Sequence, residues 1–488
     1  MLTRFLRGSS LVFAGILAGK LVAMVSSIIM ARSLSPHRFG IYLLGLSILQ
    51  IAAIVSNLGI PGVLPSLIAK IDMSGSQDGP HRLVRGAIYS CLGPALFLSA
   101  AVYACADFVS VKIFHIPEIS GMLKLTSAII PPVVITSVLT AAFRGYGRTW
   151  PRVIFQDLLP GLLTLLFFLA LIRFGFELSG AYIAFGMSSL LVFVLIARSI
   201  KKKLGMRFLV RIRELTAVIE LLRLSWPLGI ESLVWVVYTQ IDKLLIGCFL
   251  PPSQVGIYAA AASLSVILSI IPQAFSYLAL PAFSSVVSNG SKHELGLLYG
   301  KITKIIFQIS FPVFLCLVML SKEILTALYG DAYSNGSRAM AILAAGLMIS
   351  CLLGPTSEIL VSAGRTKAPL AASAAGCIAN VSLNAVLIPR YGINGAAIAN
   401  SCSVIVSLLV SGYFIHRYFN LLRWDRDYIL CPVVCLGLAP LVLLTTRLFS
   451  SYPLLAGAAI TGSVYCLSVY ALLYGMQWRK LAGVFSGR

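Results

Sequence analysis

Long runs of apolar residues dominate this chain and decide what it can fold into. Residues 11–31, 41–56, 159–172 and 181–197 hold almost no charged side chains. A helix of about 20 such residues crosses about 30 Å of hydrocarbon, and a soluble domain could not bury so many of them. With 59% hydrophobic and 11% charged residues and a mean hydropathy of +0.95, the sequence predicts an all-α integral membrane protein.

The apolar runs recur often enough to predict about 14 transmembrane helices. We expect them at residues 9–31, 38–60, 84–106, 120–143, 151–172, 178–197, 224–249, 255–284, 302–320, 338–362, 367–388, 392–416, 428–446 and 453–475. The basic start of the chain has the look of a signal peptide, but Lys20 interrupts its apolar core and no small-residue cleavage site follows. We therefore interpret it as the first span.

The formal net charge of +22 would suggest a nucleic-acid partner in a soluble protein. Here the basic residues concentrate in alternate loops, above all in the run from Arg198 to Arg223. Such a bias is what the positive-inside rule requires. We predict a multi-pass protein of the cell membrane (inner or plasma membrane), with both termini in the cytoplasm and no nucleic-acid partner.

The chain has no sequence signature of catalysis. A P-loop, a Gly-rich dinucleotide turn, a nucleophile elbow and an H-E-x-x-H motif are all missing. The ten cysteines and five histidines are scattered without metal-ligand spacing. Segments outside the predicted spans are too short, at about 25 residues or fewer, to fold a nucleotide-hydrolysing domain. We predict a secondary carrier without a cofactor, driven by a gradient, with H⁺ or Na⁺ as candidate coupling ions.

One stretch occurs twice and reveals the domain organisation. LSPHRFGIY at 34–42 returns as LPPSQVGIY at 250–258. Three further pairs of landmarks lie at nearly the same offset of about 216 residues, which identifies an internal repeat. They are Leu64-Pro65 with Leu280-Pro281, Gly147-Arg148-Thr149 with Gly364-Arg365-Thr366, and GAYIA at 180–184 with GAAIA at 395–399.

The repeat predicts two parallel six-helix bundles, related by a pseudo-two-fold axis along the membrane normal. We expect the first bundle at 1–198, a basic cytoplasmic linker at 199–223, the second bundle at 224–418, and two extra helices with a cytoplasmic tail at 419–488. In each copy of the motif the proline is expected to end one helix and the glycine to open the next. A well-formed turn retained after duplication is the simpler interpretation of the motif, ahead of a binding role.

These features resemble a known family of carriers. ARSLSP…FGIY at the end of the first span, TQIDKLLIGCFLPPSQVGIYAAA at the start of the second half and the segment SYLALPAFSSV are similar to Wzx-type flippases of polysaccharides and oligosaccharide-lipids. These flippases are a branch of the multidrug/oligosaccharidyl-lipid/polysaccharide exporter superfamily. The resemblance implies a two-bundle fold and a lipid-linked oligosaccharide as substrate. Lipid II flippases and multidrug exporters share that fold, so the resemblance leaves the sugar open.

A lipid-linked oligosaccharide carries an anionic diphosphate, so its path needs basic side chains inside the membrane. Lys20 lies midway along the first span and Lys243 lies in the seventh. An unpaired basic residue at such a depth costs about 2.5–3.5 kcal/mol on insertion scales, so its presence indicates a function or a partner. We expect both lysines to line a central cavity.

The seventh span combines acids with aromatics. Glu231, Trp235, Tyr238 and Asp242 fall on one helical stripe, with Gln240 and Lys243 beside it. Aromatic faces stack on sugar rings and carboxylates accept hydrogen bonds from hydroxyl groups, so this stripe suits an oligosaccharide. The same pattern also fits an interhelical polar contact in which Asp242 pairs with Lys243 or Lys20.

Other polar residues within the spans are weaker candidates for lining the path, carrying protons or joining helices. They are Asp157, Gln273, Glu358, Asn380 and Asn384. Arg144 and Arg148 are expected at the cytoplasmic entrance, where they either attract the diphosphate or only follow the positive-inside bias.

The sequence therefore predicts a flippase that moves a polyprenyl-diphosphate-linked oligosaccharide from the cytoplasmic to the outer leaflet by alternating access, for surface polysaccharide or glycan assembly. Membrane lipids, a glycan polymerase and glycosyltransferases are the candidate partners. One alternative is an ion-coupled multidrug exporter of the same superfamily, although a basic interior would repel cationic drugs. The other is a membrane glycan polymerase or glycosyltransferase, which would need a large outward loop with paired acids.

Overall fold

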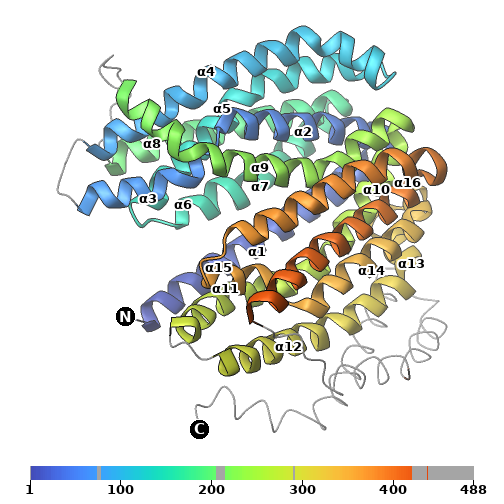
Figure 1. Cartoon of the computed structure of the whole chain (residues 1–488). Helices are drawn as coiled ribbons and strands as arrows, with labels where there is room; N and C mark the ends of the chain where they lie inside the picture. Colours follow the sequence, from blue (N-terminus) through green and yellow to red (C-terminus); the bar gives the residue numbers. More distant parts are fainter. Residues whose placement is uncertain (1, 74–78, 205–214, 289–291, 420–436, 438–488) are drawn as a thin grey trace. The chain divides into compact units, whose positions relative to one another are not determined.

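The computed structural model describes residues 2–73, 79–204, 215–288, 292–419 and residue 437. All elements in these residues are helical (Figure 1). The chain packs as two compact units, Met1–Gly256 and Ile257–Arg488. Each unit contains its own clusters of buried apolar side chains.

The first unit is built from long helices that are broken at a few defined places. Its elements are α1 (Leu2–Ser33), α2 (Pro36–Asn57), α3 (Ile60–Met73), α4 (Gly79–Phe108), the π-helix η1 (Val109–Ile113), α5 (Ile119–Gly145), the short α6 (Trp150–Arg152), the π-helix η2 (Val153–Leu158), α7 (Leu159–Ile172), α8 (Leu178–Leu204) and α9 (Leu215–Phe249). The break between α2 and α3 occurs at Leu58 and Gly59, which both have positive φ (50° and 75°).

Helix α5 is central to this unit. It packs against α2, α3, α4 and α8, and α9 lies along α2, α3 and α4. Ile130, Val134 and Val138 of α5 are fully buried in the core cluster of the unit. The repeat predicts a linker at residues 199–223 between the two bundles, whereas α9 packs with the helices that precede it. The predicted bounds of the bundles describe the duplicated segments and stay a prediction.

The repeated motif lies where α2 and α10 begin. Pro36 is the first residue of α2, and Ser35 caps this helix by accepting a hydrogen bond from the Arg38 amide at 3.4 Å. Pro252 likewise begins α10 (Pro252–Ser265). The prediction has each proline end the preceding helix, and the structure places each one as the first residue of the following helix. Proline fits the first helical turn because its missing N–H is not needed there.

The two copies of the motif touch each other through their glycines. A Cβ atom on Gly40 would overlap the carbonyl oxygen of Pro252, and one on Gly256 would lie 2.5 Å from the carbonyl oxygen of Pro36. The contact is reciprocal, and only glycine allows the two backbones to approach so closely. The two copies of the motif therefore pack against each other at these positions.

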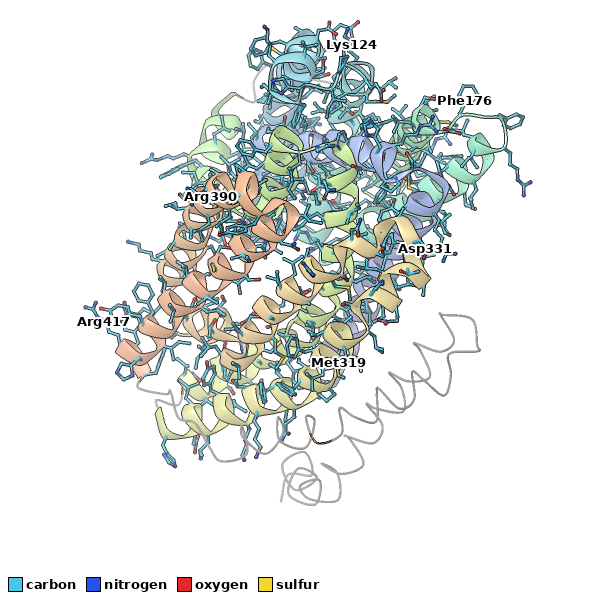
Figure 2. All side chains as sticks on the ribbon, turned by 90° about the vertical axis from the view of Figure 1, so that its right-hand side faces the viewer. Lys124, Phe176, Met319, Asp331, Arg390 and Arg417 are labelled. Atoms are coloured by element: carbon cyan, nitrogen blue, oxygen red, sulfur yellow. The ribbon has the colours of Figure 1, made fainter. Side chains whose placement is uncertain are left out.

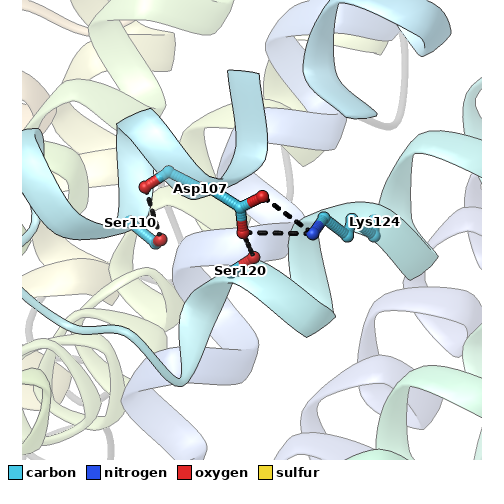
Figure 3. Close-up of polar contacts among 4 residues, drawn as sticks. All are labelled: Asp107, Ser110, Ser120 and Lys124. Atoms are coloured by element: carbon cyan, nitrogen blue, oxygen red, sulfur yellow. Dashed lines mark hydrogen bonds and ion pairs between the residues drawn. The ribbon is translucent and has the colours of Figure 1, made fainter. Parts of the chain in front are cut away.

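The first copy of the motif also carries charges that anchor the start of α2. His37 lies 3.6 Å from Glu118, just before α5, and Arg38 forms an ion pair with Glu177, just before α8. At the same end of the unit, Asp107 accepts hydrogen bonds from Ser120 and from Lys124, the latter at 2.9 and 3.0 Å (Figure 3). The second copy has Ser253 and Gln254 in place of His37 and Arg38.

The second unit begins within α10, at Ile257, and contains the helices that follow α10. They are α11 (Ile267–Ser288), α12 (Lys292–Met319), α13 (Ser321–Tyr329), the 3-10 helix η4 (Asp331–Gly336), α14 (Ser337–Leu353), α15 (Thr356–Ser362) and α16 (Lys367–Phe419). Gly392 has φ 61° and ψ −142°, so α16 consists of two helices joined at a kink. Arg390 lies beside this kink and Arg417 lies at the far end of the second half (Figure 2).

The predicted spans agree with the helices of the structure. Within the described residues, ten helices are long and apolar enough to cross a membrane, or eleven if α10 and α11, bent by 41°, form one span. The kink at Gly392 separates the predicted spans 367–388 and 392–416. The last two predicted spans and the tail lie outside the described residues. The prediction of an all-α, multi-pass membrane protein is confirmed.

Candidate functional site

Lys20 and Asp157 come together where α1 packs on the π-helix η2. Gly19 makes this packing possible, since a Cβ atom there would lie 2.7 Å from the Cβ of Asp157. Lys20 is the next residue of α1 and is exposed. The positive charges of Lys20 and Arg152 both act on the Asp157 carboxylate. Lys20 and Asp157 therefore share one site, although 137 positions separate them in the sequence (157 minus 20).

Two more polar groups reach this region from the end of α5. Arg144 donates a hydrogen bond from Nη2 to the carbonyl oxygen of Pro61 at 3.0 Å, and it lies close enough to Arg152 for their charges to repel. Gln156 of η2 donates to the Thr140 hydroxyl at 2.6 Å. We call Lys20, Arg144, Arg152 and Asp157 the basic cluster. Lys20 and Arg152 act on the one acid, and Arg144 adjoins the group through Arg152.

The structure also shows which sequence candidates stay outside the basic cluster. Arg148 lies in the exposed turn after α5, where Gly147 has a positive φ of 70°. Arg152, in contrast, belongs to the cluster. It was not predicted as a site residue, because it is one of many basic residues near a predicted helix end. Its position three residues after the turn, at the start of a new span, is the sequence feature that could have identified it.

The lysine of the seventh span belongs to a second polar group, between α9 and α2. Lys243 donates a hydrogen bond to Gln240 Oε1 at 2.9 Å, and Ser47 donates to the same oxygen at 3.1 Å. The Gln240 amide in turn donates to Gln50 Oε1 at 2.6 Å. Ser47 and Gln50 were not among the predicted residues, because their importance lies in the partner on α9 that the fold brings to them.

The remaining residues of the predicted stripe divide between two environments. Asp242 is buried, with 4% of its surface exposed, and its charge attracts that of Lys243. Trp235 is 59% exposed and stacks on Tyr238 with ring centroids 6.3 Å apart. Glu231 is exposed one turn before Trp235. The role of this aromatic pair in sugar stacking stays a prediction.

The other candidates lie in the second unit. Gln273 of α11 donates a hydrogen bond to Ser269 at 3.5 Å, and Glu358 is half-buried in α15. Asn380 and Asn384 are fully buried in α16, where the Asn384 side chain donates to the Asn380 carbonyl at 2.9 Å. These contacts are local and assign no function to the four residues.

Comparison with known proteins identifies the family. Residues 5–287, more than half of the chain, match the family described as "Polysaccharide biosynthesis protein". The chain belongs to this family. Residues 227–386 also match the MatE family. The resemblance inferred from the motifs is thereby confirmed.

Several curated proteins resemble this family member. The "Probable low-salt glycan biosynthesis flippase Agl15" of Haloferax volcanii is 24% identical over 185 residues, 38% of this chain and 39% of that protein. The "Probable flippase AglR" of the same organism is 24% identical over 39% of this chain and 40% of its own length. The "Putative O-antigen transporter" of Shigella flexneri is 21% identical over 80% of this chain and 92% of that protein. The chain thus spans about two-fifths of the two Haloferax relatives.

Solved structures share the fold of this chain. The lipid II flippase MurJ in an inward closed conformation has a TM-score of 0.76 at 15% identity, covering 97% of this chain and 99% of that one. An inward-facing multidrug resistance MATE family transporter of the MOP superfamily has a TM-score of 0.68 at 16% identity, covering 82% and 95%. At these identities the likeness concerns the fold alone.

Proposed function

We propose that this chain is a flippase that moves a polyprenyl-diphosphate-linked oligosaccharide from the cytoplasmic to the outer leaflet by alternating access. The basic cluster is the observation that carries the proposal. Lys20, Arg144 and Arg152 supply donors for phosphate oxygens, and one acid leaves the cluster with a net positive charge. Charge-assisted hydrogen bonds of this kind are about twice as strong as neutral ones and favour phosphate over uncharged sugars.

The names of the relatives support a glycan substrate. Agl15 and AglR are named as flippases and the Shigella relative as an O-antigen transporter, and none of these names describes an enzyme. We place the basic cluster at the cytoplasmic entrance, as the positive-inside rule suggests, so that the diphosphate enters there while the polyprenyl tail stays in lipid. The aromatic pair Trp235 and Tyr238 is a candidate platform for the sugar.

Further parts of the proposal concern the chain as a whole. The two halves, 1–198 and 224–418, would act as the parallel bundles of a carrier in the cell membrane, with both termini cytoplasmic. Glycosyltransferases would supply the lipid-linked oligosaccharide and a polymerase would consume it. A proton or a sodium ion would supply the driving force where the substrate gradient does not.

A drug exporter is the competing function, and the MatE match over 227–386 is the observation that favours it. Transport in vesicles separates the two. Purified protein is reconstituted into liposomes that hold a fluorescent polyprenyl-diphosphate oligosaccharide, and a membrane-impermeant quencher reports how much of it changes leaflet. A parallel set measures the uptake of a lipophilic cation. We expect movement of the lipid and none of the cation; the reverse result would establish the exporter and refute the flippase.

A further inference from the structure

Asp157 has an unusual position for a carboxylate within a membrane span. One of its oxygens, Oδ2, is buried and receives no hydrogen bond from any described residue. A buried carboxylate oxygen without a donor is costly, and within a membrane span such a group is a candidate for a functional interaction. The positive charges near this carboxylate are those of Arg152 and Lys20.

An irregular backbone segment determines the position of this carboxylate. The π-helix Val153–Leu158 widens the turn, and the Leu159 amide bonds to the carbonyl oxygen of Ile154, five residues earlier. Segments of π-helix inside longer helices are rare and are frequent at functional sites. Gly19 lets α1 come within contact distance of the widened turn, since a Cβ there would also lie 2.8 Å from the Asp157 carbonyl oxygen.

We propose that Asp157 is the resident counter-charge of the basic cluster, and that phosphate oxygens of the substrate replace its carboxylate beside Lys20 and Arg152. The inference rests on the proposed function and adds a positioning residue to it. Without substrate, the carboxylate offsets the repulsion among three clustered bases. With substrate, the same negative charge repels the diphosphate, so it weakens binding and speeds release.

This role predicts an effect that a merely structural role does not. Asp157→Asn keeps the size of the side chain but removes the negative charge. We expect the affinity of the purified protein for inorganic diphosphate, measured by calorimetry, to rise about tenfold, because one interior charge at a separation of several ångströms contributes at this scale. In the liposome assay the same variant should show a lower KM together with a lower kcat, since release becomes slower.

Matched variants make the result specific. Asp157→Glu keeps the charge and should retain wild-type affinity and turnover. Asp107→Asn removes an exposed acid of the same unit that pairs with Lys124, and it should change neither quantity. The melting temperature of each variant verifies folding. If Asp157→Asn unfolds, Asp157→Ser serves in its place, because it too removes the charge.

The outcomes separate this inference from the proposed function. Unchanged or weaker diphosphate binding by a folded, uncharged variant would overturn the counter-charge role. So would a variant that loses only gradient-driven transport at unchanged KM, since Asp157 would then be a coupling acid. Tighter binding in a protein whose wild type moves no lipid would support the counter-charge and refute the flippase.

Discussion

At the scale of single residues, Lys20 is the side chain on which the proposed phosphate site depends most. Lys20 is an exposed residue of α1 beside Asp157, whose Oδ2 atom is buried and receives no hydrogen bond from the described residues. Lys20→Ala should reduce the rate of lipid transport about tenfold or more, because a hydrogen bond to a charged group contributes about 1.5–3 kcal/mol. Lys20→Arg should retain most of the rate, and initial rates in the liposome assay measure both.

The chain offers a matched lysine for this test. Lys124 is bound to Asp107 at the other end of the first unit, away from the basic cluster, so Lys124→Ala should leave the transport rate unchanged (Figure 3). Equal losses in the two alanine variants would mean that general charge, and not the position of Lys20, determines the rate.

Single site residues were predictable from the sequence where a charged side chain lies deep inside a predicted membrane span. Lys20 and Asp157 attract attention because a charge inside an apolar run is costly, and the structure places them side by side. Arg152 was not predictable in this way, because basic residues are common near the end of a span. Ser47 and Gln50 were not predictable either, since their importance lies in the partners that the fold brings to them.

At the scale of elements, the contact between the two motif copies fixes how α2 and α10 begin. Gly40→Ala would drive a methyl group into the Pro252 carbonyl. We expect a loss of about 1–3 kcal/mol in the free energy of unfolding, the usual cost of overpacking. Gly93→Ala is the control, because nothing lies within 4 Å of a Cβ at that position of α4. It should be neutral or slightly stabilising in a thermal unfolding assay in detergent.

The polar contact between α9 and α2 gives a second prediction at this scale. Gln240→Leu leaves the Lys243 ammonium group and the Gln50 side chain without their amide partner, and should cost about 1–3 kcal/mol of stability. Adding Lys243→Met should recover only part of that loss, because it removes the ammonium group that has lost its acceptor but leaves Gln50 without its partner and Asp242 without the nearby positive charge. A double variant that is stable but inactive would assign the pair to substrate binding; one that is stable and active would make it a helix contact only.

Helices were predictable here and their irregularities were not. The span 151–172 contains a π-helix at Val153–Leu158, and the span 38–60 breaks at Leu58 and Gly59. Hydropathy reports how apolar a segment is, and a change of hydrogen-bond register leaves that unchanged. Gly392 differs because its φ of 61° combined with a ψ of −142° is a conformation that glycine alone adopts readily, and it lies directly after the gap between two predicted spans.

At the scale of the whole molecule, the repeat and the packing describe different things. The repeat counts α9 as the first helix of the second copy, yet α9 packs along α2, α3 and α4. Duplicated segments record how a chain arose, whereas packing follows the apolar and small residues that face each other. Gly229 of α9, which lies against Leu58 and Gly59, is one such residue.

The orientation of the protein in the membrane can be tested on α5 alone. Lys124 and Arg144 are about 30 Å apart along this helix at 1.5 Å per residue, the thickness of the hydrocarbon layer. If both termini are cytoplasmic, Lys124 faces outward and Arg148, just beyond the helix, faces the cytoplasm. In a variant without the native cysteines, Lys124→Cys should react with an impermeant maleimide in intact cells, and Arg148→Cys only after the membrane is opened. The opposite pattern would invert the topology and place the basic cluster on the outer side, where a substrate made in the cytoplasm could not enter it.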